Sequence, residues 1–408
     1  VVLLLGGAAA GLWFYGVNVY EQAGPKTTDG KPHVVMVNKG DTAQEVAVSL
    51  KKAGAIQDEF QFRMAMRVLG FVWKPPADDP KRKLHLKPGE YDLPSGASIK
   101  EVIDQITAGK VSYYTVVVPE GLTSAMVVDL LQNGEWNNTN PIYAPAKEEV
   151  ERQRAAYEAM SPEDKPRTFV AKRTRTLKLV GPAPVTPAEG VLLPGDYAVQ
   201  RGATIESVID RMEKAQQSLL AQLWPTRQDG LPVKSQEQAL ILASIVQNEA
   251  GNSGEQERVA SVFINRLNKP MRLESDPTIV YGISKGYPLG HGITVSERAT
   301  RTDWNTYQID GLPKTPICNP GEASIRAVLN PPRTPYYYFV ANGTAFHSFS
   351  ETYAEHLKNE AAWREFEKKR DAGNAPASAT PAPAPAKPPA KAPAKADTAK
   401  PAAATPNP

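Results

Sequence analysis

Glu249 is the residue of this sequence whose type and position best suit acid–base chemistry. The apolar residues Leu242, Ile245 and Val246 precede it by seven, four and three positions, and in an α-helix these four residues share one face. Burial among apolar side chains disfavours the charged carboxylate and raises its pKa, as a general acid near neutral pH requires. The alternative is a glutamate at a helix end, half in water or paired with a cation.

Other kinds of catalytic site find little support in the sequence. The five histidines are scattered without metal-ligand spacing, and the lone cysteine, Cys318, can build neither an intrachain disulfide nor a cysteine metal site. The chain has no GxSxG motif and no phosphate-binding glycine loop. Its net charge of +3 is too small to indicate nucleic-acid binding. We therefore expect carboxylate chemistry without a metal ion or a cofactor.

Side chains that suit a saccharide follow Glu249 in the sequence. Residues 275–282 and 305–307 supply hydroxyls, amides and aromatic rings. Amides and hydroxyls can hydrogen-bond sugar oxygens, and flat rings can stack on the apolar face of a sugar. Asp276 is the candidate for a second carboxylate, but its place before Pro277 also suits a turn residue whose side chain bonds the backbone.

The elements expected to position these residues form an α+β body. We predict helices over residues 235–249, 255–267 and 351–369, because apolar residues recur there at helical spacing. An Asn-Gly pair between residues 336–340 and 347–349 predicts a hairpin of two strands.

Upstream of this body the sequence repeats a small unit: a turn glycine, a Ser or Thr, and an amphipathic helix. Residues 86–104 and 192–210 match at a constant offset of 106, and shorter copies begin at Gly40 and Gly121. Strand-like runs precede several copies, so each copy is expected to be a small α+β unit. These units resemble the LysM type of glycan-binding module. The alternative is a duplicated scaffold that contacts no sugar.

The two ends of the chain complete the expected domain plan. Residues 1–20 carry no charge and, at about 1.5 Å per helical residue, can cross the roughly 30 Å hydrocarbon layer of a membrane. A cleaved signal peptide is the alternative for this segment. The plan is a transmembrane helix (1–20), a linker (21–32), a LysM-like region (33–190) with a charged, solvated insertion at about 141–187, a catalytic domain (191–370), and a disordered Ala/Pro/Lys tail (371–408).

Seven motifs, taken in order, resemble the YceG-like family. They lie at residues 243–249, 259–267, 275–278, 305–307, 311–313, 316–321 and 336–340. The likeness is dense over residues 190–368, and the upstream region agrees with the family in order. Lys314 and the long insertion depart from the family pattern, and neither departure touches Glu249.

The resemblance implies an endolytic lytic transglycosylase. It would cut nascent peptidoglycan strands between N-acetylmuramic acid and N-acetylglucosamine, leave a 1,6-anhydro end, and so help to terminate strand elongation. Glu249 falls on the family's catalytic glutamate. The substrate-binding residues it suggests are Asp276, Thr278, Tyr281, Asn305 and Tyr307. It also implies a single-pass anchor in the inner membrane, a periplasmic catalytic domain, and peptidoglycan synthases as partners.

Two other functions remain open from the residues alone. A non-catalytic peptidoglycan-binding scaffold would use the same modules without cleavage. A lysozyme-type hydrolase would need a second carboxylate to position water, for which Asp276 is the candidate.

Overall fold

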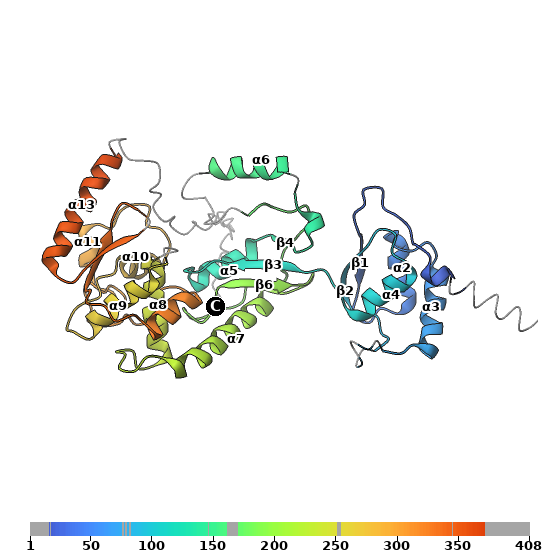
Figure 1. Cartoon of the computed structure of the whole chain (residues 1–408), viewed down its shortest axis with the longest axis horizontal. Coiled ribbons are helices and arrows are strands. Elements are labelled where there is room, and N and C mark those ends of the chain that lie inside the picture. The colour runs from blue at the N-terminus through green and yellow to red at the C-terminus, as the bar shows by residue number, and fades with distance from the viewer. Residues whose placement is uncertain are drawn as a thin grey trace, which may run out of the picture.

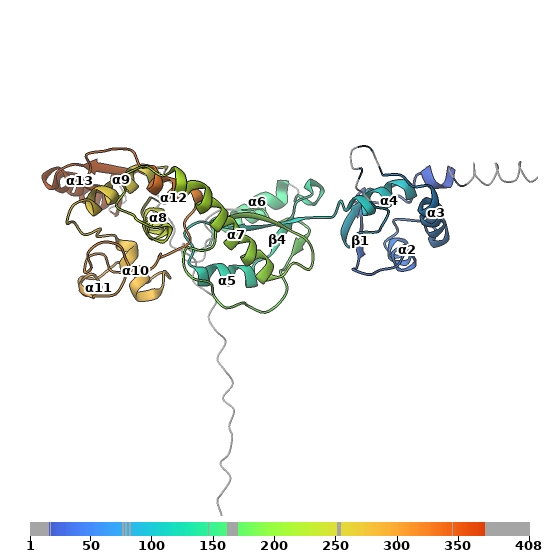
Figure 2. The ribbon, with the colours of Figure 1, turned by 90° about the horizontal axis from the view of Figure 1, so that it is seen from below.

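A computed structural model describes the fold as three bodies in a row (Figures 1 and 2). The structure describes residue 16 and residues 18–371, apart from 76, 78, 79, 81, 82, 146, 161–169, 251–253 and 345. The expected membrane-spanning segment lies almost wholly outside these residues, as does the expected tail beyond residue 371. Among the described residues, no helix combines the length and the hydrophobicity that a membrane span requires.

The N-terminal module is a two-stranded sheet covered by helices. Its elements are β1 (His33–Val37), α2 (Ala43–Lys52), α3 (Glu59–Val72), β2 (Gly89–Leu93) and α4 (Ile99–Ala108). β1 and β2 are antiparallel, with His33 opposite Leu93 and Val37 opposite Gly89. Alternate strand residues and the apolar faces of the helices form one core, which includes Leu50, Phe62 and Tyr91. The order strand–helix–helix–strand gives the module its α+β character.

The central unit is a four-stranded sheet with helices packed against it. Its elements are β3 (Tyr114–Val118), α5 (Ser124–Asn133), β4 (Trp136–Asn138), η1 (Pro141–Tyr143), α6 (Lys147–Glu158), β5 (Thr176–Leu177), β6 (Gly195–Val199), α7 (Ile205–Leu223) and η2 (Trp224–Thr226). The strand order is β5-β4-β3-β6. Because β6 pairs along its whole length with β3, residues 195–199 belong to this sheet. The boundary expected at residue 191 therefore separates β6 from the sheet to which it belongs, and the C-terminal body begins later in the chain.

The structure shows how the sequence repeat is built into these two bodies. β1 and β3 lie 81 residues apart, whereas β2 and β6 lie 106 residues apart, so the second copy carries about 25 extra residues between its strands. In each copy a tyrosine on the later strand donates to a carbonyl four residues earlier: Tyr91 to Lys87 at 2.7 Å, and Tyr197 to Leu193 at 2.6 Å. The extra residues include α6, which buries none of its side chains.

The C-terminal body holds Glu249. It contains α8 (Gln236–Ala250), α9 (Gln256–Leu267), α10 (Asp276–Ser284), α11 (Val295–Ala299), α12 (Glu322–Leu329), β7 (Tyr338–Ala341), β8 (His347–Ser350) and α13 (Tyr353–Asp371). α8, α9 and α12 pack around a core that includes Leu242, Phe263 and Ile325. The predicted helices and hairpin are confirmed here, with ends that differ by a few residues.

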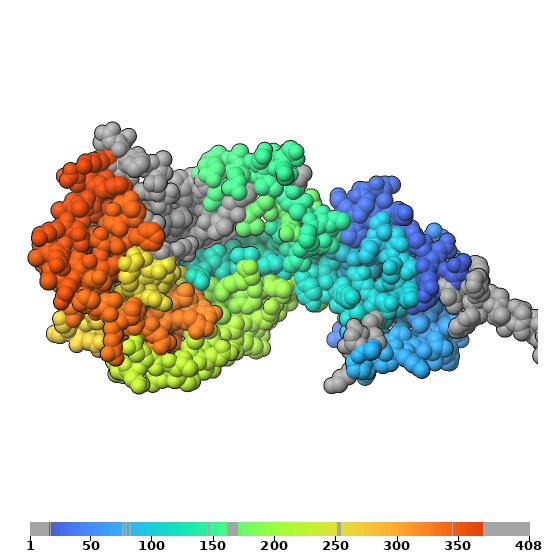
Figure 3. Space-filling model, in the orientation of Figure 1, coloured from blue at the N-terminus to red at the C-terminus, as the bar shows by residue number. Residues whose placement is uncertain are grey.

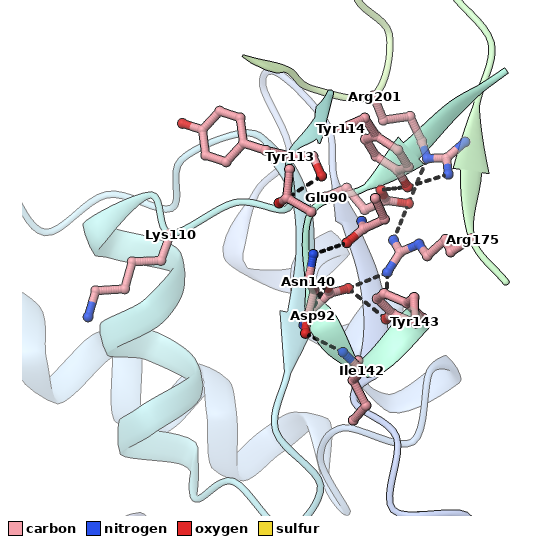
Figure 4. Close-up of polar contacts among 12 residues, drawn as sticks. Glu90, Asp92, Lys110, Tyr113, Tyr114, Asn140, Ile142, Tyr143, Arg175 and Arg201 are labelled. Atoms are coloured by element: carbon pink, nitrogen blue, oxygen red, sulfur yellow. Dashed lines mark hydrogen bonds and ion pairs between the residues drawn. The ribbon is translucent and has the colours of Figure 1, made fainter. Parts of the chain in front are cut away.

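A buried ion-pair network joins the N-terminal module to the central unit (Figure 4). Glu90 and Asp92 project from β2, and Glu90 is only 5% exposed. Arg175 pairs with Glu90 at 2.6 Å and also with Asp92, while Arg201 pairs with Glu90 at 2.6 Å. The hydroxyl of Tyr114 donates to Glu90 at 2.7 Å. The two bodies meet at a narrow neck (Figure 3), and the network joins residues from both of them.

Arg175 comes from the segment expected to be a solvated arm. The segment is only partly solvated, because β5 pairs with β4 and Arg175 is mostly buried against Glu90 and Asp92. The sequence showed a basic run here but not the carboxylates that it meets, since these lie more than 80 positions earlier in the chain.

We predict that Arg175→Ala lowers the free energy of unfolding by about 3 kcal/mol, because removing one partner leaves a buried carboxylate poorly compensated. Urea unfolding of the full chain measures the change. Arg364→Ala is the control, since Arg364 pairs with Glu360 on an exposed helix face and such pairs contribute less than about 1 kcal/mol. Equal effects of the two substitutions would mean that the network does not stabilise the junction.

Candidate active site

Glu249 lies in the last turn of α8 and is half-buried. Leu242, Ile245 and Val246 are completely buried beneath it, as their spacing predicted. Glu249 therefore sits where the apolar core of the C-terminal body meets its surface. One end of its side chain is in the core, and the carboxyl group is within reach of polar groups from α10.

Ser275 is the residue that holds the Glu249 carboxyl. Its hydroxyl donates to Glu249 Oε1 at 2.6 Å. Ser275 is also the N-cap residue of α10, yet its side chain makes no capping bond to that helix. A serine at this position ordinarily accepts from a backbone N–H of the first turn. Here the hydroxyl bonds to Glu249 instead. The first turn of α10 therefore lacks a side-chain cap, and the hydroxyl positions the carboxyl group of Glu249.

The surroundings of Glu249 raise its pKa to about 7. Burial is the main cause, because it disfavours the charged form. The negative charge of Asp276 raises the pKa further, whereas the Ser275 hydrogen bond and the more distant Arg266 lower it. A carboxyl that is about half protonated near neutral pH can both give and take a proton there.

Asp276 and Tyr307 form a second pair beside Glu249. The Tyr307 hydroxyl donates to Asp276 Oδ1 at 2.8 Å. Burial, and then the charge of Asp276, raise the pKa of Tyr307, with a smaller contribution from Glu249. The side chain of Asp276 is exposed and bonds to a phenol. The structure thus brings Glu249, Asp276 and Tyr307 close together.

Thr278 and Asn305 lie inside the protein rather than at a surface that a substrate could reach. Thr278 donates to the Ser275 carbonyl at 2.6 Å and accepts from the Thr306 amide at 3.1 Å. Asn305 donates to the Thr300 carbonyl at 2.6 Å. Both side chains are buried. The expectation that these two residues line a cleft does not agree with their burial. Their hydrogen bonds instead fix the loops that carry Ser275 and Tyr307.

Tyr281 is also buried, and it links the site to the central unit. Its ring packs edge-on to Trp304 at 5.4 Å between centroids, and its hydroxyl bonds to Glu189. Glu189 in turn accepts from the Ser124 amide at 2.9 Å. Burial raises the pKa of Glu189 to about 6.

The sequence did not single out Ser275 or Glu189 as functional residues. Ser275 belongs to the motif at residues 275–278. A serine just before a helix is expected to cap that helix, so the sequence did not indicate its bond to Glu249. Nothing in the sequence pairs Glu189 with Tyr281, because they meet only through the fold. Among the described residues, no group of three or more His, Cys, Asp or Glu side chains could hold a metal ion.

The fold and the site define a mixed α+β protein with a half-buried carboxyl group whose pKa is raised to about 7. The model of the YceG-like family matches residues 35–362. This chain belongs to the YceG-like family, which confirms the resemblance found in its motifs.

Named relatives extend the comparison. The chain is 27% identical over 371 residues to the endolytic murein transglycosylase of Bacillus subtilis (strain 168), covering 87% of this chain and 90% of that protein. It is 25% identical over 356 residues to the endolytic murein transglycosylase of Streptococcus pneumoniae serotype 2 (strain D39 / NCTC 7466), covering 82% of this chain but 59% of that protein. A crystal structure of a yceG-like protein from Listeria monocytogenes is 26% identical, with a TM-score of 0.41, and covers 80% of this chain and 98% of that chain.

We predict that Glu249→Gln stabilises the protein more as the pH rises. The pKa of Glu249 is about 7 in the folded protein and 4.5 ordinarily. Between these pH values the carboxyl ionises in the unfolded chain but not in the folded one, so the free energy of unfolding of the native protein falls as the pH rises. A neutral amide at this position causes no such fall. Melting temperatures of the two proteins should agree near pH 4, diverge up to about pH 7, and then stay apart. Glu257→Gln, on the exposed face of α9, is the control. A constant difference across this range would contradict a raised pKa.

Proposed function

We propose that this chain is an endolytic murein transglycosylase. It cleaves peptidoglycan glycan strands between N-acetylmuramic acid and N-acetylglucosamine and leaves a 1,6-anhydro-muramic end. The observation that carries the proposal is the half-buried carboxyl of Glu249, whose pKa lies near 7 and whose position is fixed by Ser275. Family membership and the names of the relatives support the same conclusion.

The reaction needs one proton and one group to move it. Protonated Glu249 gives its proton to the glycosidic oxygen as the bond to the muramic C1 breaks and positive charge develops on that sugar. The resulting Glu249 carboxylate then takes the proton of the 6-hydroxyl of the same sugar, and the 6-oxygen bonds to C1. The carboxyl ends protonated, as it began. Attack from within one sugar is favoured, because no second molecule has to be brought into place.

The other site residues are assigned by what they contact. Ser275 orients the carboxyl of Glu249 and, by stabilising the ionised form, favours release of its proton to the glycosidic oxygen. Asp276 and Tyr307 are proposed to contact the sugar, since their bonded pair lies beside Glu249 and Asp276 is exposed. Thr278, Asn305 and Tyr281 are proposed as positioning residues. A hydrolase would instead use Asp276 to activate water.

Features outside the site support a finer proposal for where the enzyme works. The uncharged residues 1–20 suit an anchor in the inner membrane, which would keep the periplasmic enzyme near newly made strands and near peptidoglycan synthases. The strand–helix–helix–strand order of the N-terminal module supports a LysM-like role in glycan binding.

We predict that Glu249→Gln lowers cleavage of purified glycan strands by about a thousandfold or more, because the amide cannot transfer the proton. Mass spectrometry of the products separates the functions: anhydro ends indicate transglycosylation, reducing ends indicate hydrolysis, and intact strands with the native protein indicate a binding scaffold. Asp276→Asn is the matched variant. It should weaken cleavage while leaving anhydro ends, and reducing ends from the native protein would overturn the proposal.

We also predict that Ser275→Ala shifts the activity profile to higher pH. Its hydroxyl lowers the pKa of Glu249, so without it the carboxyl stays protonated to a pH above about 7. The pH at which the rate falls on the alkaline side should be higher for the variant than for the native protein. Ser284→Ala at the end of α10, where the hydroxyl bonds only backbone carbonyls, is the control. An unchanged pH for this fall would show that Ser275 does not tune the acid.

A further inference from the structure

A polar pocket of about 210 Å³ lies where the N-terminal module meets the central unit. We call it the junction pocket. Residues from both bodies and from the segment between them line it, and the argument uses Asp92, Gln105, Lys110, Ser112, Tyr113 and Asn140. It is separate from the site at Glu249, none of whose residues line it.

Hydrogen bonds already hold several of these polar groups in place. Gln105 Nε2 donates to the Asp92 carbonyl at 3.0 Å, and Asn140 Nδ2 lies 3.4 Å from an Asp92 carboxylate oxygen. Asp92 is itself fixed by the ion pair with Arg175 (Figure 4). The pocket wall therefore presents donors and acceptors in set positions, so a ligand would meet a largely preorganised surface.

Ser112 lines the pocket and has an unsatisfied hydroxyl. The residue is 7% exposed, and its hydroxyl has no hydrogen-bond partner among the described residues. Buried polar groups in folded proteins nearly always have one, and an unmet group costs free energy. Its backbone amide, by contrast, donates to the Glu90 carbonyl at 2.7 Å. The hydroxyl is buried in the pocket wall, and a bound molecule could satisfy it after a local shift of that wall.

Two exposed side chains complete the pocket and indicate the kind of ligand. Tyr113 keeps 41% of its surface exposed and offers a flat ring. Lys110 is exposed, and its ammonium makes no hydrogen bond or ion pair within the described part of the chain. A ring face beside mixed donors and acceptors matches the apolar face and the hydroxyl edge of a sugar. An apolar ligand would leave these polar groups unpaired.

We propose that the junction pocket is a second saccharide-binding site, which holds an N-acetylated sugar of the glycan strand at a distance from Glu249. This proposal rests on the proposed function for the class of ligand, but not for the reaction. A sugar bound there contacts both bodies at their neck. It would therefore hold the strand and stiffen the junction together.

The test uses the full chain carrying Glu249→Gln, so that no cleavage interferes, and the linear hexamer of N-acetylglucosamine as the probe. Hydrogen exchange followed by mass spectrometry reports where the probe binds. The hexamer should slow exchange in residues 110–114 and 138–143. Tyr113→Ala should weaken the affinity measured from this protection about tenfold or more.

Ser112→Ala gives the sharpest variant. Because its hydroxyl has no partner in the protein, removing it should leave the melting temperature equal or higher while lowering the affinity at the junction pocket. Ser98→Ala is the matched control: Ser98 caps α4, so its loss should lower the melting temperature without changing the protection at residues 110–114.

Protection confined to other segments, or protection at the junction that Tyr113→Ala and Ser112→Ala leave unchanged, would overturn the proposal. The outcome is independent of the reaction. Anhydro ends made by the native protein with no protection at the junction would refute the second site alone. Protection at the junction in a chain that makes no anhydro ends would refute the transglycosylase and keep the saccharide site.

Discussion

The organising constraint of the site is that a carboxyl group is kept partly out of water and that, among the described residues, no cation bonds to it. Arg266 is near enough to Glu249 to influence its pKa, but its guanidinium is engaged by the carbonyls of Tyr337 and Leu273 and by Glu274. The hydroxyl of Ser275 is the group that bonds the carboxyl. A direct arginine pair would hold the group ionised at neutral pH, whereas a hydroxyl leaves the proton free to move.

A few residues of the C-terminal body keep that hydroxyl in place. Thr278 and Thr306 bond to each other and to the backbone of Ser275, and Glu274 just before it adopts a left-handed backbone conformation with φ of 51°. Such a conformation is strained for a residue with a side chain and persists only when its neighbours enforce it. The motifs around residues 275 and 305 are thus a support for one serine as much as a contact surface.

The sequence predicted the elements that depend on local pattern. It did not predict contacts between residues that lie far apart in the chain. Helical spacing located α8 and placed Glu249 against the core, and the turn residues located the hairpin of β7 and β8. The repeat also stands out in the sequence, but the pairing of β6 with β3 does not, so the boundary expected at residue 191 separates β6 from the other strands of its sheet. The polar side chains of Thr278 and Asn305 could hydrogen-bond either a sugar or the backbone of a neighbouring loop. Only the packing in the folded protein distinguishes these two roles. The bond from Ser275 was hidden for the same reason, because a serine before a helix is expected to cap it.

The duplicated unit has a geometric consequence through its asymmetry. The extra residues of the second copy supply Arg175, which reaches back to the strand of the first copy and fixes the two bodies end to end. The C-terminal body lies at the far end of this row (Figure 1). If the chain is anchored in a membrane near residue 20, as proposed, the length of this row of bodies determines the distance between the membrane and Glu249. Glycan strands would then be cut only within a layer at that distance from the membrane.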